Sequence, residues 1–235
     1  KDHFVGALKG KIWSENIDAK IVDISHDIDA FNHAEASYII GCAYKSFPKG
    51  TVHIIGVDCE LNIENQHVAI LWNDQYFICA DNGILGMLTQ NIVPQKIVAI
   101  NIHDRLPSEA TDMDVFIVVA NHLSKGGLLN VIGKEITEIK TFTELKPVIE
   151  PDLIKGYIMY IDHFGNAVTN ISKRLFTETR RGRSYKIDLS KSYKNNANII
   201  KTIYNKYSDI GMNQKYPLKN YEGEKLAIFN EANYL

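Results

Sequence analysis

Residues Thr51–Glu60, with the sequence TVHIIGVDCE, contain the clearest buried-strand pattern of the chain. Residues 51–57 are mostly apolar and β-prone, and they run directly into Asp58. A short run of this kind is typical of a buried strand. A carboxylate at the C-terminal tip of such a strand lies where open α/β sheets bind their ligands. Asp58 could instead only cap the next turn, so its role depends on what the rest of the chain contains.

The size and composition of the chain indicate an ordinary globular protein. Its 235 residues suit one large domain or two modest ones. With 45% hydrophobic and 23% charged residues, it can bury a proper core. The net charge of −2 creates no overall field that would favour nucleic acid or an anionic membrane. We therefore expect neither of these partners.

Cysteine usage and the absence of targeting signals predict a cytoplasmic protein. The 3 cysteines, Cys42, Cys59 and Cys79, form no CxxC pair, which indicates reduced thiols and neither a disulfide framework nor a zinc site. His26, His53 and His122 lack metal-ligand spacing, so no metal is expected. No apolar run approaches the roughly 18 residues of a membrane span, and no signal peptide is visible. Both ends of the sequence look like structured segments, so we expect further residues beyond each.

The first part of the chain, residues 1–146, alternates predicted strands and helices. The predicted helices cover residues 4–16, 33–46, 84–88 and about 115–124, and the predicted strands cover residues 20–25, 51–57, 67–72, 75–80 and 96–101. Asn73-Asp74 suits a tight hairpin, and Thr111 or Asp112 can cap the last helix. This alternation favours an α/β domain whose mainly parallel sheet is flanked by helices on both faces.

The pattern changes at residues 147–151, where Pro147 and Pro151 are typical of a linker. Beyond it, short β-like runs at 155–161, 167–171, 184–189 and 225–229 accompany weak helical periodicity. We therefore expect residues 152–235 to form a smaller, β-rich C-terminal domain, barrel-like or a sandwich.

A second candidate site is the stretch Ile161–Ile171, IDHFGNAVTNI. Asp162 can accept hydrogen bonds from an amine, Phe164 offers an aromatic face, and Asn166 offers the donor and acceptor that suit a nucleobase edge. The same residues, with Gly165 in a tight turn, could form only a hairpin stabilised by Asx-type hydrogen bonds. Residue chemistry alone leaves both interpretations open.

Five stretches together resemble one family, the S-adenosylmethionine (SAM) hydroxide adenosyltransferases, which are adenosine-forming SAM hydrolases related to the fluorinase and chlorinase. The matching stretches are DHFVGALKG at 2–10 (family DxYVGxxKG), IVDISHD at 21–27 (IVDITHD), FPKGTVH at 47–53 (FPxGTVH), DNG at 81–83, and DHFGNAVTNI at 162–171 (DxFGNxxTNI). Each stretch is weak alone, but their order and spacing are specific.

The resemblance implies an α/β N-terminal domain, a smaller β-rich C-terminal domain, and a homotrimer. In the family, the ligand lies between the N-terminal domain of one subunit and the C-terminal domain of the next. Water or hydroxide displaces methionine at the ribose C5′ of SAM, giving adenosine and L-methionine. SAM is the substrate, and no further cofactor is implied.

The resemblance also implies roles for individual residues. The catalytic aspartate of the family falls on Asp58. The substrate contacts fall on Asp2 at the methionine end, Phe31 beside the nucleoside, Asp162 at the amine, Phe164 and Asn166 at the adenine, and Asn230 near the end of the chain.

The sequence departs from the family at two of the three catalytic positions. Asn65 stands where the family has arginine, and Thr111 stands where it has histidine. The candidate catalytic positions are therefore Asp58, Asn65 and Thr111, with Glu60 as the best substitute for the missing groups. Because an ordinary aspartate is a feeble base, we expect Asp58 to orient the attacking water without fully deprotonating it.

Two other functions remain open at the level of sequence. The changes at Asn65 and Thr111 would suit a SAM- or adenosine-binding protein with weakened catalysis. A SAM-dependent halogenase is disfavoured, because family halogenases avoid a carboxylate at the position of Asp58, where it would repel a halide.

Overall fold

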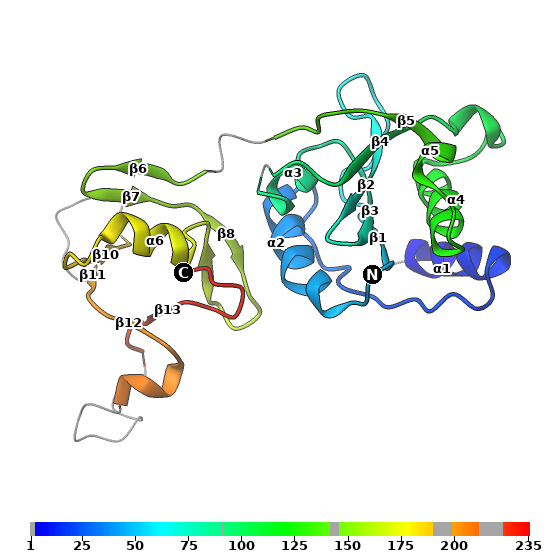
Figure 1. Ribbon diagram of the computed structural model, residues 1–235. Helices are drawn as coiled ribbons and strands as arrows, with labels where there is room; N and C mark the ends of the chain where they lie inside the picture. The colour runs from blue at the N-terminus through cyan, green and yellow to red at the C-terminus, as the bar shows by residue number, and fades with distance from the viewer. Residues whose placement is uncertain (1–2, 91, 142–145, 190–198, 212–222) are drawn as a thin grey trace. The chain divides into compact units, whose positions relative to one another are not determined.

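The computed structural model describes residues 3–90, 92–141, 146–189, 199–211 and 223–235 (Figure 1). The chain divides into two compact units, Lys1–Glu144 and Leu145–Leu235. The first unit runs from blue to green in Figure 1, and the second from yellow-green to red. None of the described helices is long and apolar enough to cross a membrane.

A five-stranded sheet forms the centre of the first unit. Its strands are β1 (Val52–Ile54), β2 (His67–Trp72), β3 (Gln75–Ala80), β4 (Lys96–Ile100) and β5 (Gly133–Glu135), in the order β1-β3-β2-β4-β5. Strand β1 is parallel to β3, whereas the β2–β3, β2–β4 and β4–β5 pairs are antiparallel. The prediction of a mainly parallel sheet is therefore wrong.

The hairpin between β2 and β3 explains much of this difference. Asn73 and Asp74 both adopt positive φ angles, 49° and 61°. Two such residues make the tight turn that matches the twist of a two-stranded ribbon. Strands joined by so short a turn must pair antiparallel, because a parallel pair needs a long crossover connection.

Helices cover both faces of the sheet, as predicted (Figure 1). The helices of the first unit are α1 (His3–Glu15), α2 (His33–Ala43), α3 (Ile84–Leu88), α4 (Asp112–Ser124) and α5 (Leu129–Ile132), with 3₁₀ turns at Tyr44–Ser46 and His103–Arg105. Helices α2 and α3 pack on one face against Val68 and Phe77. Helices α4 and α5 pack on the other face against Ala69 and Ile78, and α1 packs against α4. Alternate residues of the strands thus contribute to two separate cores, one on each face of the sheet.

Two predicted strands differ from the structure. Residues 20–25 do not form a strand, and none of the described strands pairs with them. Residues 51–57 form a strand only at Val52–Ile54, after which Ile55 N donates one more hydrogen bond to Ile78 O at 2.9 Å. The chain then turns, so Asp58 lies in the turn and not at the tip of the strand itself.

In its described residues, the second unit consists of short paired strands and one helix. The pairs are β6 (Val148–Glu150) with β7 (Leu153–Lys155), β8 (Ile158–Ile161) with β9 (Ala167–Thr169), β10 (Ile187–Asp188) with β11 (Ile199–Ile200), and β12 (Ile203–Tyr204) with β13 (Ala227–Ile228). No closed barrel forms among these strands, so the barrel-like prediction is not confirmed for the described part of the unit. Strand β6 lies inside the predicted linker at 147–151.

A helix that the sequence analysis missed, α6 (Lys173–Arg180), follows β9. The side chain of Ser172 caps it by accepting a hydrogen bond from Leu175 N at 3.2 Å. A 3₁₀ turn, Tyr207–Gly211, lies between β12 and β13.

Candidate functional site

Asp58 lies where the chain leaves β1, and its backbone is held in an uncommon conformation. Its φ of 48° is in the left-handed region, which costs free energy for residues other than glycine and is least costly for Asn and Asp. The side-chain amide of Asn82 donates to Val57 O and Asp58 O, both at 3.0 Å. Asn82 is only 3% exposed and follows β3, the parallel neighbour of β1. The ends of two adjacent strands thus fix the turn that carries Asp58.

The carboxylate of Asp58 contacts a histidine that the sequence analysis did not single out. Asp58 Oδ2 lies 2.9 Å from His33 Nε2, and the two side chains are 22% and 21% exposed. An ionised carboxylate can only accept hydrogen bonds, so His33 Nε2 is the donor. His33 is the first residue of α2, whose N-cap is Asn32. No local sequence signal joins positions 33 and 58, because the contact depends on how α2 packs on the sheet.

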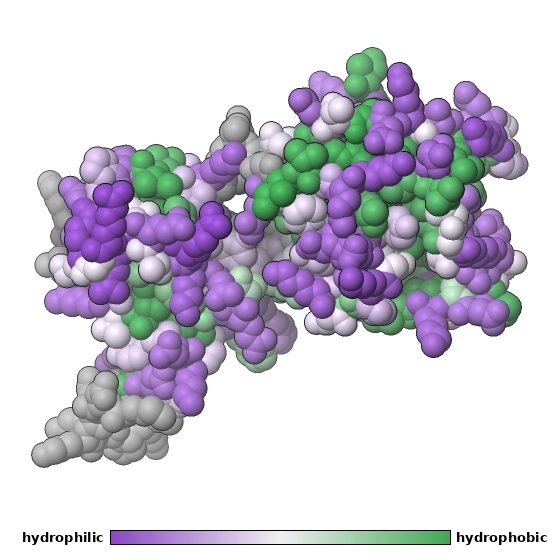
Figure 2. All heavy atoms as spheres, viewed as in Figure 1, coloured by the Kyte–Doolittle hydropathy of each residue, from purple (hydrophilic) through white to green (hydrophobic). Residues whose placement is uncertain are grey.

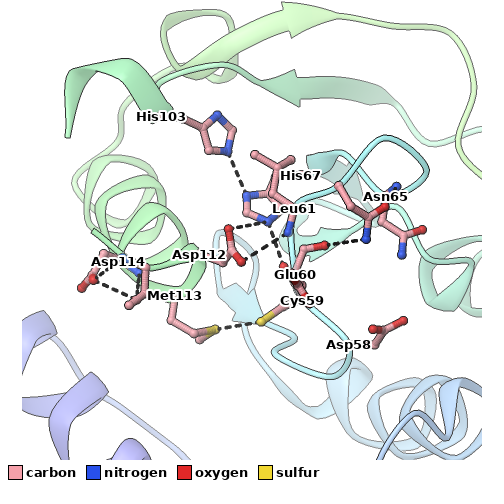
Figure 3. A network of polar contacts seen from close by, with 12 residues as sticks. Asp58, Cys59, Glu60, Leu61, Asn65, His67, His103, Asp112, Met113 and Asp114 are labelled. Atoms are coloured by element: carbon pink, nitrogen blue, oxygen red, sulfur yellow. Dashed lines mark hydrogen bonds and ion pairs between the residues drawn. The ribbon is translucent and has the colours of Figure 1, made fainter. Parts of the chain in front are cut away.

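The loop after Asp58 is tied to the start of α4 (Figure 3). Leu61 N donates to Asp112 Oδ2 at 3.2 Å, and Cys59 Sγ lies 3.7 Å from Met113 Sδ. Burial raises the pKa of the Cys59 thiol, so this cysteine stays protonated near neutral pH. Through these contacts, Asp112 and Met113 hold the loop in place.

Two histidines support the same loop through consecutive hydrogen bonds. The side chain of His67 is fully buried, its Nε2 lies 2.9 Å from Cys59 O, and its Nδ1 lies 3.0 Å from His103 Nε2. A carbonyl oxygen only accepts, so His67 Nε2 carries the hydrogen and His103 donates to His67 Nδ1. Burial lowers the pKa of His67, which favours this neutral form. The chain of donors runs from His103 through His67 to the backbone beside Asp58.

The side chains of Asn65 and Thr111, two predicted catalytic positions, make hydrogen bonds to residues other than Asp58. Asn65 Oδ1 accepts from Lys140 Nζ at 2.8 Å. Thr111, one of the two predicted caps, is the N-cap of α4, and its hydroxyl donates to Asp114 Oδ2 at 2.8 Å. Both side chains are thus bonded to other side chains of the first unit. Glu60 is exposed on the loop itself.

Phe31 and Asp2 belong to the predicted substrate contacts of the first unit. Phe31 is 72% exposed and adopts a φ of 60°, so its ring stands on a strained turn immediately before α2. Such an exposed ring is available to stack on another planar group. Asp2 lies outside the described residues.

The remaining predicted contacts lie in the second unit. Asp162 closes the turn between β8 and β9: its Oδ1 accepts from Phe164 N at 2.9 Å and from Asn166 N at 2.8 Å. Its Oδ2 accepts from the side-chain amide of Asn166 at 2.8 Å, and this hydrogen bond lowers the pKa of Asp162. The turn geometry leaves Phe164 87% exposed. Asn230 Oδ1 accepts from Tyr234 N at 2.9 Å.

The arrangement offers exposed aromatic rings and a partly exposed carboxylate, with hydrophobic patches interspersed among hydrophilic residues on the face drawn in Figure 2. Within the described ranges, no group of three or more His, Cys, Asp or Glu side chains is placed to hold a metal ion.

Comparisons with family models and with a curated relative agree on one family. Residues 1–133 match the family model for the SAM hydroxide adenosyltransferase N-terminal domain, and residues 156–235 match the model for its C-terminal domain. A relative from Methanocaldococcus jannaschii named (R)-S-adenosyl-L-methionine hydrolase is 31% identical over 178 residues, which cover 72% of this chain and 62% of the relative. The chain thus matches less than two thirds of the length of that relative.

The solved structures that resemble the chain include the following two. An uncharacterized conserved protein from Thermotoga maritima aligns over 100% of this chain and 86% of its own, with a TM-score of 0.80 and 27% identity. A conserved hypothetical protein from Thermus thermophilus aligns over 73% of this chain and 68% of its own, with a TM-score of 0.57 and 22% identity, which supports the fold alone.

Proposed function

The chain belongs to the SAM hydroxide adenosyltransferase family, and from this premise we propose that it hydrolyses S-adenosyl-L-methionine to adenosine and L-methionine. The observation that carries the proposal is the carboxylate of Asp58. It is partly exposed, it sits on a strained turn at the end of β1, and buried Asn82 fixes its backbone. Strained residues held by their surroundings cluster at functional sites.

The proposed step is a direct displacement. The oxygen of a water molecule forms a bond to the ribose C5′ while the C5′–S bond breaks. The electron pair of that bond passes to the sulfur of methionine, and the proton lost by the water passes to solvent. Because a sulfonium is a good leaving group, the protein mainly has to hold the water in line with C5′ and exclude other water.

Asp58 supplies two parts of this step. Its carboxylate accepts a hydrogen from the attacking water and orients it. It also attracts the positive sulfonium, by about 4 kcal/mol at ~4 Å and an effective dielectric constant of about 20. An ordinary aspartate is too weak a base to deprotonate water fully before attack. We assign Asn65 and Thr111 to holding the segments around Asp58, in line with their hydrogen bonds to Lys140 and Asp114.

Substrate recognition is proposed for residues of both units. The exposed rings of Phe31 and Phe164 suit stacking on the adenine or packing on the ribose. The proposed polar contacts of the substrate are Asp2, Asp162, Asn166 and Asn230.

The proposed assembly is a homotrimer in which neighbouring subunits share each site. Mass photometry tests the assembly, and a monomer at assay concentration would refute it.

The activity is tested by incubating the protein with SAM and separating the products by chromatography. We expect adenosine and methionine in equal amounts, and background levels with D58A. Adenosine no higher than with D58A would refute the proposal.

A second candidate is a SAM- or adenosine-binding protein without turnover, which the altered positions Asn65 and Thr111 favour. Calorimetry that shows tight SAM binding together with no adenosine would support this alternative. A SAM-dependent halogenase is disfavoured, because the charge of Asp58 would repel a halide. Formation of a 5′-halo-nucleoside that depends on added halide would reverse that judgement.

A further inference from the structure

We propose that His33 is the positioning residue of the reaction: it holds one oxygen of Asp58 so that the other faces the attacking water. This inference rests on the proposed hydrolysis. Asp58 Oδ2 lies 2.9 Å from His33 Nε2. Among the described residues, no hydrogen bond reaches Asp58 Oδ1, so this oxygen remains available to a water molecule.

The residues at the altered motif positions do not take this role. Asn65 is bonded to Lys140 and Thr111 to Asp114, while Asp112 is used to hold Leu61 N. Figure 3 shows Asp58 to the side of this network, apart from His67 and Asp112. Within the described part of the chain, the carboxylate of Asp58 therefore takes its orientation from His33.

The pair is positioned by packed elements and not by a flexible surface loop. Helix α2 contributes Ala36 and Ile40 to the same core cluster as Ile55, which precedes Asp58, and Val57 packs against that cluster. The N-cap Asn32 fixes the start of α2 by accepting from Glu35 N at 3.1 Å. The distance between His33 and Asp58 is thus set by the core, which is the preorganisation that an in-line attack requires.

The hydrogen bond that His33 donates fixes the orientation of the Asp58 carboxylate. A carboxylate bonded through one oxygen cannot rotate freely, so the lone pairs of the second oxygen keep a fixed direction. This fixed direction is lost when His33 is replaced by a side chain without a donor.

The chain offers a matched control. His26 Nε2 lies 3.1 Å from Asp23 Oδ1, in a similar histidine–aspartate pair on the extended segment before α2. Asp23 is also bonded to Lys9, at 2.6 Å. The proposed reaction uses neither residue of this pair, so H26Q should leave the rate unchanged.

The experiment measures kcat and KM for adenosine formation with the wild-type protein and with D58A, H33A, H33Q and H26Q. We expect H33A to lower kcat by about 10- to 100-fold with less than about a threefold change in KM, because a misdirected carboxylate affects the attack and not binding. Glutamine places an amide donor near the position of Nε2, so H33Q should recover most of the lost rate. Circular dichroism and thermal unfolding check that each variant is folded.

The outcomes separate the two proposals. Wild-type kcat in H33A, or an equal loss in H33Q and H33A, would overturn the role of His33 while leaving the hydrolysis intact. A loss in H26Q as large as in H33A would also overturn it. A wild-type rate no greater than that of D58A would refute the hydrolysis itself, and the role of His33 with it.

Discussion

The two units of the chain are built in different ways. The first has a continuous five-stranded sheet with a core on each face, and side chains such as Phe77 and Phe116 are fully buried. The second has separate two-stranded pairs, and its described buried apolar side chains are Val168, Ile200 and Ala227. The turn that carries Asp58 is fixed by buried Asn82 and adjoins the core through Ile55 and Val57, whereas the turn at Asp162 is held by local hydrogen bonds. We therefore expect the reaction to depend on the first unit and ligand recognition to draw on the second.

The largest effect is expected at Asp58. D58N keeps the shape of the side chain and tolerates the left-handed backbone, but it removes the charge. We expect adenosine formation to fall by about 100-fold or more, because the amide neither attracts the sulfonium nor orients water as a carboxylate does. Chromatography measures the rate, and urea denaturation checks that stability is little changed. A D58N rate close to that of the wild type would contradict the placement of the reaction in the first unit.

The next effect concerns the support of the loop. H67A removes a buried ring and leaves Cys59 O and His103 without their partner, so we expect the free energy of unfolding to fall by about 3 kcal/mol. Urea denaturation measures the change. The control is H122A, which removes a partly exposed ring that lies 3.1 Å from Leu128 O, and should cost clearly less. Equal losses of unfolding free energy in H67A and H122A would show that the buried His67–His103 pair stabilises the protein no more than a partly exposed histidine does.

A smaller effect is expected in the second unit. F164A removes an 87% exposed ring, so stability should stay constant while KM for SAM rises about tenfold through lost stacking. Y207A removes another exposed ring of the same unit, 56% exposed, and should leave KM unchanged. Steady-state kinetics measure both. If F164A lowered kcat and left KM constant, the expectation that the second unit serves ligand recognition and not the reaction would be wrong.

The smallest effect is a pH dependence of stability in the first unit. Burial lowers the pKa values of His53 and His67 below the ordinary value of 6.5. Below that value the unfolded chain binds more protons than the native protein, so stability falls as the pH falls, by at most about 1.4 kcal/mol per pH unit for each group. Urea denaturation at pH 5.5 and 7.5 should show lower stability at 5.5. H67Q should reduce this difference, and an unchanged difference would exclude His67 as a cause.

Much of the first unit could be predicted from sequence, because its signals are local. The alternation and turn chemistry of residues 67–80 predicted the strands β2 and β3 with the bounds they have in the structure. Thr111, which caps α4, was one of the two residues predicted as its cap. Strand direction is not encoded in hydrophobic periodicity, so the sheet was predicted as mainly parallel although the Asn73-Asp74 turn implied an antiparallel pair. Helix α6 was missed because its short sequence is mostly polar, although Ser172 offered a cap signal.

The site was only partly predictable. The motif match located Asp58 and the changed positions Asn65 and Thr111, since these follow from comparing residues in order. The match could not show which residue contacts Asp58, because His33 lies 25 positions away in the chain and reaches it only through packing of α2 on the sheet. The hydrogen-bonded pair of His67 and His103 depends on tertiary structure in the same way.

The left-handed backbone at Asp58 restricts how this position can change over evolutionary time. Asparagine and glycine fit there without distorting the turn, whereas valine, isoleucine or threonine would force the chain to find another path. A single replacement by asparagine or glycine would therefore preserve the turn while removing the charge that attracts the sulfonium. The fold would be retained, whereas the proposed reaction and part of the affinity for SAM would be lost.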